Sequence, residues 1–344
     1  MAHLQKSDII ITDVKINEIV RKYDKSYKIK NIIPIEEGVA NPVFILETQK
    51  SDLVLRILNP LTGDWKAIKE KTVYELFTKL KIPCPIVLKT DISKKLIPFD
   101  YVISKRLRGN ALDKVISNQT MNSKIKIVKE LGRYLGKIHS VTFNKSGDIS
   151  KRGSKFVVGP AHELSDVSKT IKSGPFSSWK DMHREIIKSR LYHFKRTEFK
   201  DMIEPIKKYF KKNEHLLDFK ITPRLLHLDL NRNNIFVKNN KITGILDVEE
   251  SLIGHNEYDL LRTELHFKGN LKLRNEFFKE YKKYTSLDDG YEKRRPFYSL
   301  SRALVGVRCL VLWKSKYTKK SYLKEKKWVI SHINKIIKHN KLEL

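Results

Sequence analysis

The chain has 344 residues, which is long enough to bury a large core and to form two lobes. Its 40% hydrophobic and 10% aromatic residues exclude a disordered protein, and its two cysteines exclude a disulfide framework or a cysteine zinc site. No run of 18 apolar residues and no secretory signal pattern occurs, so we expect no membrane span and a cytoplasmic location.

The formal net charge is +31, from 70 Lys and Arg against 39 Asp and Glu. Such an excess alone would suggest RNA or an anionic surface as partner. The lysines are spread along the whole chain, however, and no nucleic-acid-binding motif accompanies them. We therefore interpret most of the charge as solvated surface and keep nucleic acid as the alternative.

Short β runs fill residues 28–59, with Gly38 and Asn41 at the first turn. In the third run, Arg56 interrupts an otherwise apolar strand, Leu53 to Leu58. A cation at such a position needs a carboxylate or a phosphate as partner unless it points to solvent. This part of the sequence predicts an antiparallel sheet.

A helical stripe over residues 64–81 follows the strands, and a strand with a turn occupies residues 99–109. Beyond this point the apolar spacing predicts mostly helices, at residues 123–139, 177–194, 199–210 and from 275 onward. Residues 144–175 carry Gly, Ser and Pro without periodicity, so we expect a long loop there.

The most informative stretch is residues 226–250, LHLDLNRNNIFVKNNKITGILDVEE. Two β-branched runs, 234–238 and 241–246, are separated by a pair of asparagines, which tolerate the positive φ of tight hairpin turns. His227, Asp229 and Asn234 precede this hairpin, and Asp247 follows it. Asp and Asn also gather in ordinary turns, so the stretch by itself leaves simple turn chemistry open.

This arrangement suits phosphoryl transfer, in which a protein positions a hydroxyl and holds Mg²⁺ with little covalent chemistry of its own. Asp229 can accept the hydroxyl proton, and Asn234 and Asp247 can supply oxygen ligands to the metal.

The stretch resembles the catalytic segment of the aminoglycoside phosphotransferase and choline kinase group, relatives of protein kinases. HLDLNRNN matches a His-x-Asp-x-x-x-x-Asn loop, and LDVEE matches the end of a hairpin that carries a metal-binding Asp. The chain departs from the group at Leu228, where Gly is frequent, and at residues 232–233, where Pro-Gly is frequent.

The resemblance implies a role for several other residues of the first half. Gly38 and Asn41 would lie over the phosphates, Arg56 would contact them, and Glu70 would pair with Arg56, with Glu75 as the fallback. Residues 104–109 would form a hinge. Within it, backbone groups of Ser104, Lys105 and Arg106 would bind adenine.

In the catalytic segment the resemblance implies that His227 braces the loop, that Asp259 stabilises it, and that Asp229 acts as base. An acidic window, residues 245–261, has no Lys or Arg. We interpret it as a pocket for Mg²⁺ and a cationic or polyhydroxylated substrate, with Glu249 and Glu250 as candidate substrate contacts, although it equally fits metal binding alone.

We therefore predict an α+β, protein-kinase-like two-lobed fold: a nucleotide-binding lobe at 1–103, the hinge at 104–109 and a mainly helical catalytic and substrate-binding lobe at 110–344. The predicted activity is that of a small-molecule kinase using ATP or GTP with Mg²⁺. The alternatives are a non-catalytic basic protein that binds RNA or an anionic surface and, less favoured, a protein kinase. The sequence does not identify the acceptor: an aminoglycoside, a choline-like amine, an amino-acid hydroxyl and a sugar all stay open.

Overall fold

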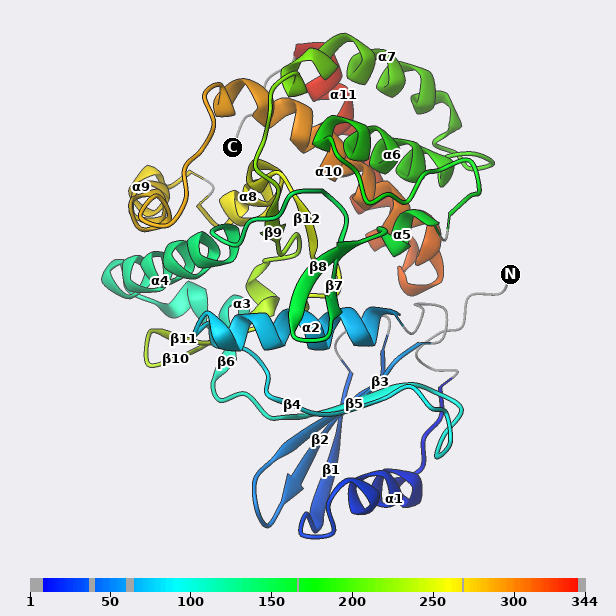
Figure 1. The fold of residues 1–344 in the computed structure, drawn as a ribbon, viewed down its shortest axis with the longest axis vertical. Coiled ribbons are helices and arrows are strands. Elements are labelled where there is room, and N and C mark those ends of the chain that lie inside the picture. The colour runs from blue at the N-terminus through cyan, green and yellow to red at the C-terminus, as the bar shows by residue number, and fades with distance from the viewer. Residues whose placement is uncertain (1–8, 37–40, 60–64, 166, 268, 340–344) are drawn as a thin grey trace. The chain divides into compact units, whose positions relative to one another are not determined.

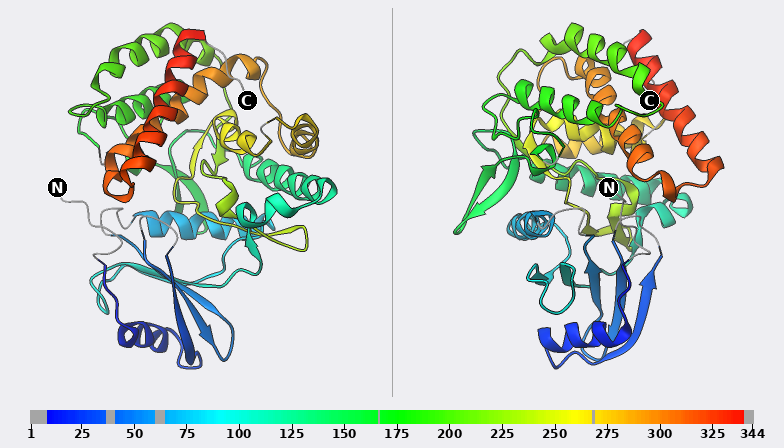
Figure 2. Two further views of the ribbon diagram at one scale, coloured as in Figure 1. Left: turned by 180° about the vertical axis from the view of Figure 1, so that it is seen from behind. Right: turned by 90° about the vertical axis from the view of Figure 1, so that its right-hand side faces the viewer.

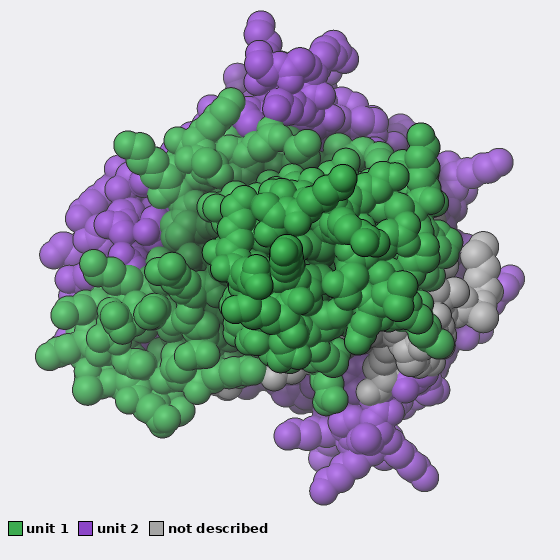
Figure 3. Space-filling model, turned by 90° about the horizontal axis from the view of Figure 1, so that it is seen from below, with its two compact units in different colours: residues 1–127, 232–249 green, residues 128–231, 250–344 purple. Residues whose placement is uncertain are grey.

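The computed structural model describes residues 9–36, 41–59, 65–165, 167–267 and 269–339 (Figure 1). Its contacts divide the chain into two compact units, one of residues 1–127 and 232–249 and one of residues 128–231 and 250–344 (Figure 3). The predicted hinge at 104–109 belongs to the first unit. The functional division at this hinge stays a prediction.

The first unit is built on a five-stranded antiparallel sheet with the order β1-β2-β3-β5-β4. A second sheet, β11-β10-β6, lies in the same unit. The elements are α1 (Asp13–Tyr23), β1 (Ile29–Ile35), β2 (Val43–Thr48), β3 (Leu53–Ile57), α2 (Trp65–Lys79), β4 (Val87–Asp91), β5 (Tyr101–Lys105), β6 (Asn110–Ala111), α3 (Leu112–Val115), β10 (Ile235–Lys238) and β11 (Lys241–Ile245).

Strand alternation gives the five-stranded sheet two different faces. In β3, Leu53, Leu55 and Ile57 are fully buried and share a core with Ile16 and Ile19 of α1. Successive side chains of a strand point to opposite faces, so Arg56 lies on the face away from that core. Helix α1 was not predicted, although Thr12 caps it by accepting the Lys15 N–H.

The second unit is mainly helical. Its elements are α4 (Met121–His139, which begins in the first unit's range), β7 (Asp148–Arg152), β8 (Lys155–Gly159), α5 (His162–Ser165), α6 (Trp179–Tyr192), α7 (Ile203–Asn213), β9 (Arg224–Leu226), β12 (Leu252–Gly254), α8 (Asn256–Glu264), α9 (Leu271–Tyr281), α10 (Tyr291–Leu312) and α11 (Lys319–His339). One core joins α6, α7, α10 and α11, and Figure 2 shows α11 alongside α10.

The long loop predicted at 144–175 is wrong in its central part. Strands β7 and β8 form a regular antiparallel hairpin there, with the turn at Gly153, whose φ is +60°. The run Phe156–Val158 is too short to stand out in a periodicity search, and the pairing of the two strands stabilises it.

An antiparallel sheet with a helix precedes a mainly helical part, as predicted for the α+β fold class. Among the described residues, none of the helices is both long and apolar enough to cross a membrane. The cytoplasmic location stays a prediction.

Candidate phosphoryl-transfer site

The predicted hairpin is present in the first unit as β10 and β11. Lys238 pairs with Lys241, and Asn239 and Asn240 have φ values of +51° and +59°. Both central residues of the turn therefore occupy the left-handed region, which Asn reaches more easily than most residues. The asparagine pair that predicted this turn also adopts its left-handed conformation.

The two predicted metal ligands lie together at the ends of this hairpin. Asn234 Nδ2 is 3.5 Å from Asp247 Oδ2, and the Leu246 N–H donates to the Asn234 carbonyl at 2.9 Å. Asp247 itself has a φ of +61°, and its N–H donates to the Tyr74 hydroxyl at 3.1 Å. Burial raises the pKa of Tyr74, which keeps this hydroxyl protonated. Tyr74 was not singled out in the sequence.

The ion pair predicted between Arg56 and Glu70 is present. The Arg56 guanidinium contacts the Glu70 carboxylate, and Glu70 is only 6% exposed. Arg56 projects from the sheet face opposite the α1 core, and Glu70 belongs to the buried side of α2. A buried carboxylate fixes the direction of a planar guanidinium well. The contact of Arg56 with phosphates stays a prediction.

Glu249 has a partner that the sequence analysis missed. Lys66 Nζ is 3.0 Å from Glu249 Oε1. Lys66 lies on α2, one turn before Glu70. Burial alone would raise the pKa of Glu249, but the charges of Lys66 and Arg56 outweigh burial and hold that pKa below its usual value. Glu249 is thus an ionised carboxylate held by a lysine, and a role in binding substrate stays a prediction.

The predicted phosphate-covering turn is described only in part, because Gly38 lies outside the described residues. The Asn41 side-chain oxygen accepts the Asn59 N–H at 2.9 Å. Asn41 therefore links the start of β2 to the end of β3, and its place near phosphates stays a prediction.

The residues predicted to bind adenine lie at the end of β5. The Lys105 N–H donates to the Ile86 carbonyl and the Arg106 N–H donates to the Asp52 carbonyl, both at 3.0 Å. Ser104 pairs with β3 and β4 on its two sides. These two N–H groups already donate hydrogen bonds to carbonyls of the protein. Adenine recognition here would therefore have to use other backbone groups of the segment.

In the second unit, the loop that carries Asp229 follows β9 directly. Leu226 pairs with Leu252 of β12, and two residues later Leu228 has a φ of +67°. Leu228 is 2% exposed. The resembling group often has Gly at position 228, and the backbone there is left-handed, as Gly allows. This chain has a buried leucine at that position.

Asp259 of α8 holds this loop. Its carboxylate accepts the His227 N–H at 2.5 Å and the Leu228 N–H at 2.8 Å, and it lies 3.0 Å from His139 Nε2. Burial would raise the pKa of Asp259, but the hydrogen bond from His139 and the interactions with His227 outweigh it and lower that pKa. An ionised, fully buried carboxylate thus fixes two consecutive backbone groups.

His227 is fully buried, and its side chain forms a hydrogen bond within its own loop. The Asp229 N–H donates to His227 Nδ1 at 3.2 Å. Nδ1 therefore acts as an acceptor, which is the neutral Nε2–H form of the ring. The hydrogen bond links His227 to the loop, and the role of His227 in bracing the loop stays a prediction.

Two polar side chains of the second unit lie beside the Asp229 carboxylate in the part of the chain that the structure describes. Asn231 Nδ2 lies 3.1 Å from Oδ2, and Arg262 Nε lies 3.4 Å from Oδ1. Arg262 comes from α8, one turn after Asp259. The sequence analysis missed it, although the spacing of three residues on one helix places both side chains on the same face.

Arg302 of α10 is a second contact to the loop that the sequence did not reveal. Its Nη2 donates to the Leu228 carbonyl at 2.7 Å. The peptide groups on both sides of Leu228 are thus tied, one by Asp259 and one by Arg302. Arg302 and Leu228 are 74 positions apart, so no local pattern could have predicted their contact.

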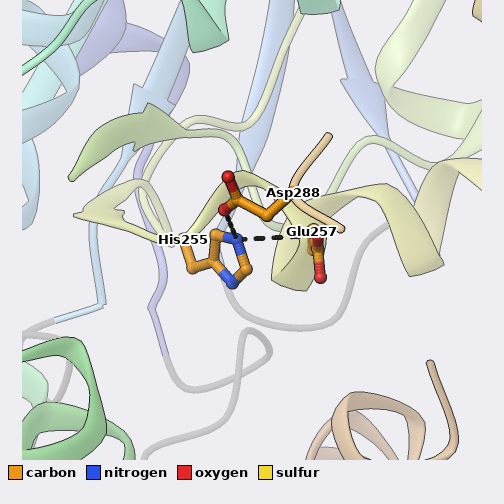
Figure 4. A group of neighbouring side chains, drawn as sticks. All are labelled: His255, Glu257 and Asp288. Carbon is orange, nitrogen blue, oxygen red and sulfur yellow. Dashed lines mark hydrogen bonds and ion pairs between the residues drawn. The ribbon is translucent and has the colours of Figure 1, made fainter. Parts of the chain in front are cut away.

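The acidic window is not the open pocket that its composition suggested. Glu257 is fully buried and accepts two hydrogen bonds of 2.7 Å from Arg294, and Asp259 serves the loop. Figure 4 shows Glu257 beside His255 and Asp288, with His255 Nε2 2.9 Å from Asp288 Oδ2. Because Arg294 engages both Glu257 oxygens, we assign this group to bracing the start of α8.

Glu250, the other predicted substrate contact, lies in the second unit and is partly buried. Its charge acts on Arg190, whose pKa is lowered by burial. A contact of Glu250 with substrate stays a prediction.

Comparison with known proteins agrees with this arrangement. A family model described as "Phosphotransferase enzyme family" matches residues 31–297, which is more than half of the chain. Hygromycin-B 4-O-kinase of Escherichia coli is 20% identical over 260 residues, covering 75% of this chain and 67% of the relative.

Solved structures share the fold. Aminoglycoside phosphotransferase APH(4)-Ia has a TM-score of 0.67 at 14% identity, covering 96% of this chain and 100% of that one. ADP-bound aminoglycoside phosphotransferase APH(2'')-Ib has a TM-score of 0.62 at 15% identity, covering 95% and 99%. The chain therefore belongs to the phosphotransferase enzyme family, as an enzyme of the kinase type with the protein-kinase-like fold.

Proposed function

We propose that this protein transfers the γ-phosphate of ATP or GTP to a hydroxyl of a small molecule with the help of Mg²⁺. The observation that carries the proposal is the anchored loop: Asp259 holds the backbone immediately before Asp229, and His227 accepts the Asp229 N–H. A base must be held in place before substrate arrives if it is to lower the barrier. Asp229 is held in this way.

In the proposed reaction, Asp229 accepts the proton of the acceptor hydroxyl as its oxygen forms a bond to the γ-phosphorus. The bond from that phosphorus to the bridging oxygen breaks, and the nucleoside diphosphate leaves with the electron pair. Asn231 and Arg262 orient the Asp229 carboxylate through contacts of 3.1 and 3.4 Å.

Asn234 and Asp247 fit Mg²⁺ because both side chains can offer an oxygen ligand and they are neighbours, with Asn234 Nδ2 3.5 Å from Asp247 Oδ2. A bound ion would neutralise charge on the phosphates. Tyr74 fixes the Asp247 backbone, and the hairpin fixes the Asn234 carbonyl. On the same unit, Arg56 is oriented by Glu70 and would bind the phosphates that precede the transferred one.

Relatives support the nature of the two substrates. A thermostable mutant of APH(4)-Ia was solved as a ternary complex with AMP-PNP and hygromycin B. By analogy we propose a nucleoside triphosphate and a polyhydroxylated or cationic acceptor for this chain, with Glu250 as one acceptor contact. An aminoglycoside, a choline-like amine, an amino-acid hydroxyl and a sugar form the acceptor panel.

The first test is thermal unfolding with ATP or GTP, each with and without Mg²⁺. A nucleotide at 100 times its dissociation constant should add about 2.7 kcal/mol to the free energy of unfolding. Asp247→Ala should abolish the part of this shift that needs Mg²⁺. Asp289→Ala, which removes an exposed carboxylate, is the matched control and should respond as the wild type does.

The second test is phosphate transfer from labelled nucleotide to the acceptor panel, with Asp229→Ala as the inactive variant. Transfer that survives Asp229→Ala would overturn the role of this residue. If neither nucleotide shifts the wild type while RNA does, with an affinity that falls steeply with salt, the kinase proposal fails and the basic charge is the function.

A further inference from the structure

Helices α6 and α7 enclose a cavity of about 420 Å³ in the second unit. Its inner wall is apolar and includes Ile187 and Leu191 of α6, Phe210 of α7 and Phe297 of α10. These four side chains are 1–7% exposed. The volume falls within the range of small-molecule sites, which are mostly apolar with a few polar groups.

The mouth of this cavity is strongly basic. Six cations line it, against a single carboxylate, Glu214: Lys180, Arg184, Lys188, Lys195, Lys207 and Lys211. Four of the six form ion pairs, with Asp218, Glu214, Glu185 and Glu204. Lys195 and Lys211 are exposed and have no ion pair among the described residues. Two positive charges at the mouth are therefore uncompensated.

The one titratable group deep in the cavity wall adds no charge. His183 is 2% exposed, lies 3.0 Å from Ser301 through Nε2, and has its pKa lowered by burial to about 3. The ring is neutral at ordinary pH. The cavity thus offers an uncharged, apolar interior below a ring of cations.

This combination selects one class of ligand. An apolar body gains free energy by leaving water for the interior, and an anionic head gains from the lysines at the mouth. A polycationic ligand would meet the uncompensated charges of Lys195 and Lys211, which disfavour it. A fully polar anion would make no apolar contacts with the interior wall, so it would gain no free energy from the cavity itself.

We propose that the α6–α7 cavity is a binding site for a small amphipathic carboxylate, such as a medium-chain fatty acid. The site goes beyond the phosphoryl-transfer reaction, because it shares no residue with the set that carries Asp229, Asn234 and Asp247. Its ligand is held by its chain between α6 and α7 and by its carboxylate near Lys195 and Lys211.

Calorimetry of the full chain with decanoate below its micelle concentration tests this. We expect saturable binding of one decanoate, weaker binding of the uncharged 1-decanol and no binding of decyltrimethylammonium. Equal binding of the three compounds would mean that the cavity accepts any apolar chain, and it would overturn the selectivity for anions. Absence of decanoate binding would overturn the site itself.

Three variants locate the ligand. Ile203→Trp enlarges a partly buried wall residue and should abolish decanoate binding, with thermal unfolding used to verify the fold. Lys195→Gln with Lys211→Gln should weaken binding about fivefold, as expected for two exposed charges. The matched control, Lys324→Gln with Lys327→Gln, changes the net charge equally at two exposed positions of α11 and should bind as the wild type does.

If both lysine pairs weaken decanoate equally, the overall charge of the protein is responsible and the proposed mouth is wrong. If Ile203→Trp does not fold, the contrast between the two lysine pairs still decides. Nucleotide binding measured in the same variants should stay at the wild-type level, which separates this site from the proposed kinase activity.

Discussion

Asp259 accepts the backbone N–H of Leu228 at 2.8 Å, at a residue whose φ is +67°. One buried carboxylate therefore stabilises a backbone conformation that a leucine does not favour. The next residue is Asp229, the proposed base. We infer that Asp259 is a positioning residue, through which the proposed reaction depends on this contact.

Asp259→Asn should lower kcat of phosphate transfer more than it raises the KM for nucleotide. The substitution keeps the shape but replaces one acceptor oxygen by a donor, so a backbone N–H or His139 loses its partner at a buried site. A buried donor without a partner costs about 1–3 kcal/mol. Urea unfolding should report this loss, and Asp289→Asn should leave both quantities unchanged. An increase in KM alone would contradict the positioning role.

Leu228→Gly should be more stable than Leu228→Ala by about 1 kcal/mol, because a left-handed residue with a Cβ costs about 1–2 kcal/mol. Both variants lose the packing of a buried leucine and should be less stable than the wild type. The control is Leu226, which is fully buried in β9. There the order should reverse, since Gly in a strand is less stable than Ala. The same order at both positions, in urea unfolding, would contradict the argument.

The parts of the site that were predicted from the sequence carry local signals. The turn at Asn239 and Asn240 is favoured by the residues of the turn itself, and the hairpin brings Asn234 and Asp247 close together. A cation in an apolar strand needs a partner, and the resemblance to the phosphotransferase group implied Glu70 as the partner of Arg56. Their functional roles stay predictions.

The parts that were missed depend on contacts between distant residues. Arg302 reaches the Leu228 carbonyl across 74 positions, and Lys66 reaches Glu249 across 183. The acidic window was misinterpreted at Glu257 for the same reason: the window is acidic in composition, but Arg294 neutralises Glu257 from another helix. Composition counts charges along the chain, whereas a pocket depends on which charges lie together in the fold.

Glu70→Gln should weaken nucleotide binding about tenfold, because Arg56 loses the carboxylate that orients it toward the phosphates. Glu75→Gln makes the same chemical change five residues further along α2 and is the matched control. The KM for ATP or GTP measures both. A double-mutant cycle with Arg56→Gln should give a coupling of 0.5–3 kcal/mol, typical of residues in contact. Equal losses in Glu70→Gln and Glu75→Gln would remove Glu70 from its proposed role.

His183→Gln should make the stability of the protein less dependent on pH below 6.5. Burial, with smaller contributions from the charges of Arg190 and His255, lowers the pKa of His183 from 6.5 to about 3. Between these values the unfolded chain binds one proton that the folded chain does not. The free energy of unfolding therefore falls by about 1.4 kcal/mol per pH unit as the pH decreases.

Urea unfolding at pH 5.5 and 4.5 should show this slope reduced by about 1.4 kcal/mol per pH unit in His183→Gln. Gln retains a polar partner for Ser301, which limits the loss of stability above pH 7 to the packing and hydrogen-bond changes. His215→Gln, at an exposed histidine, should keep the wild-type slope. If His183→Gln also keeps that slope, His183 is not the group whose neutral, buried form links the stability of α6 to pH.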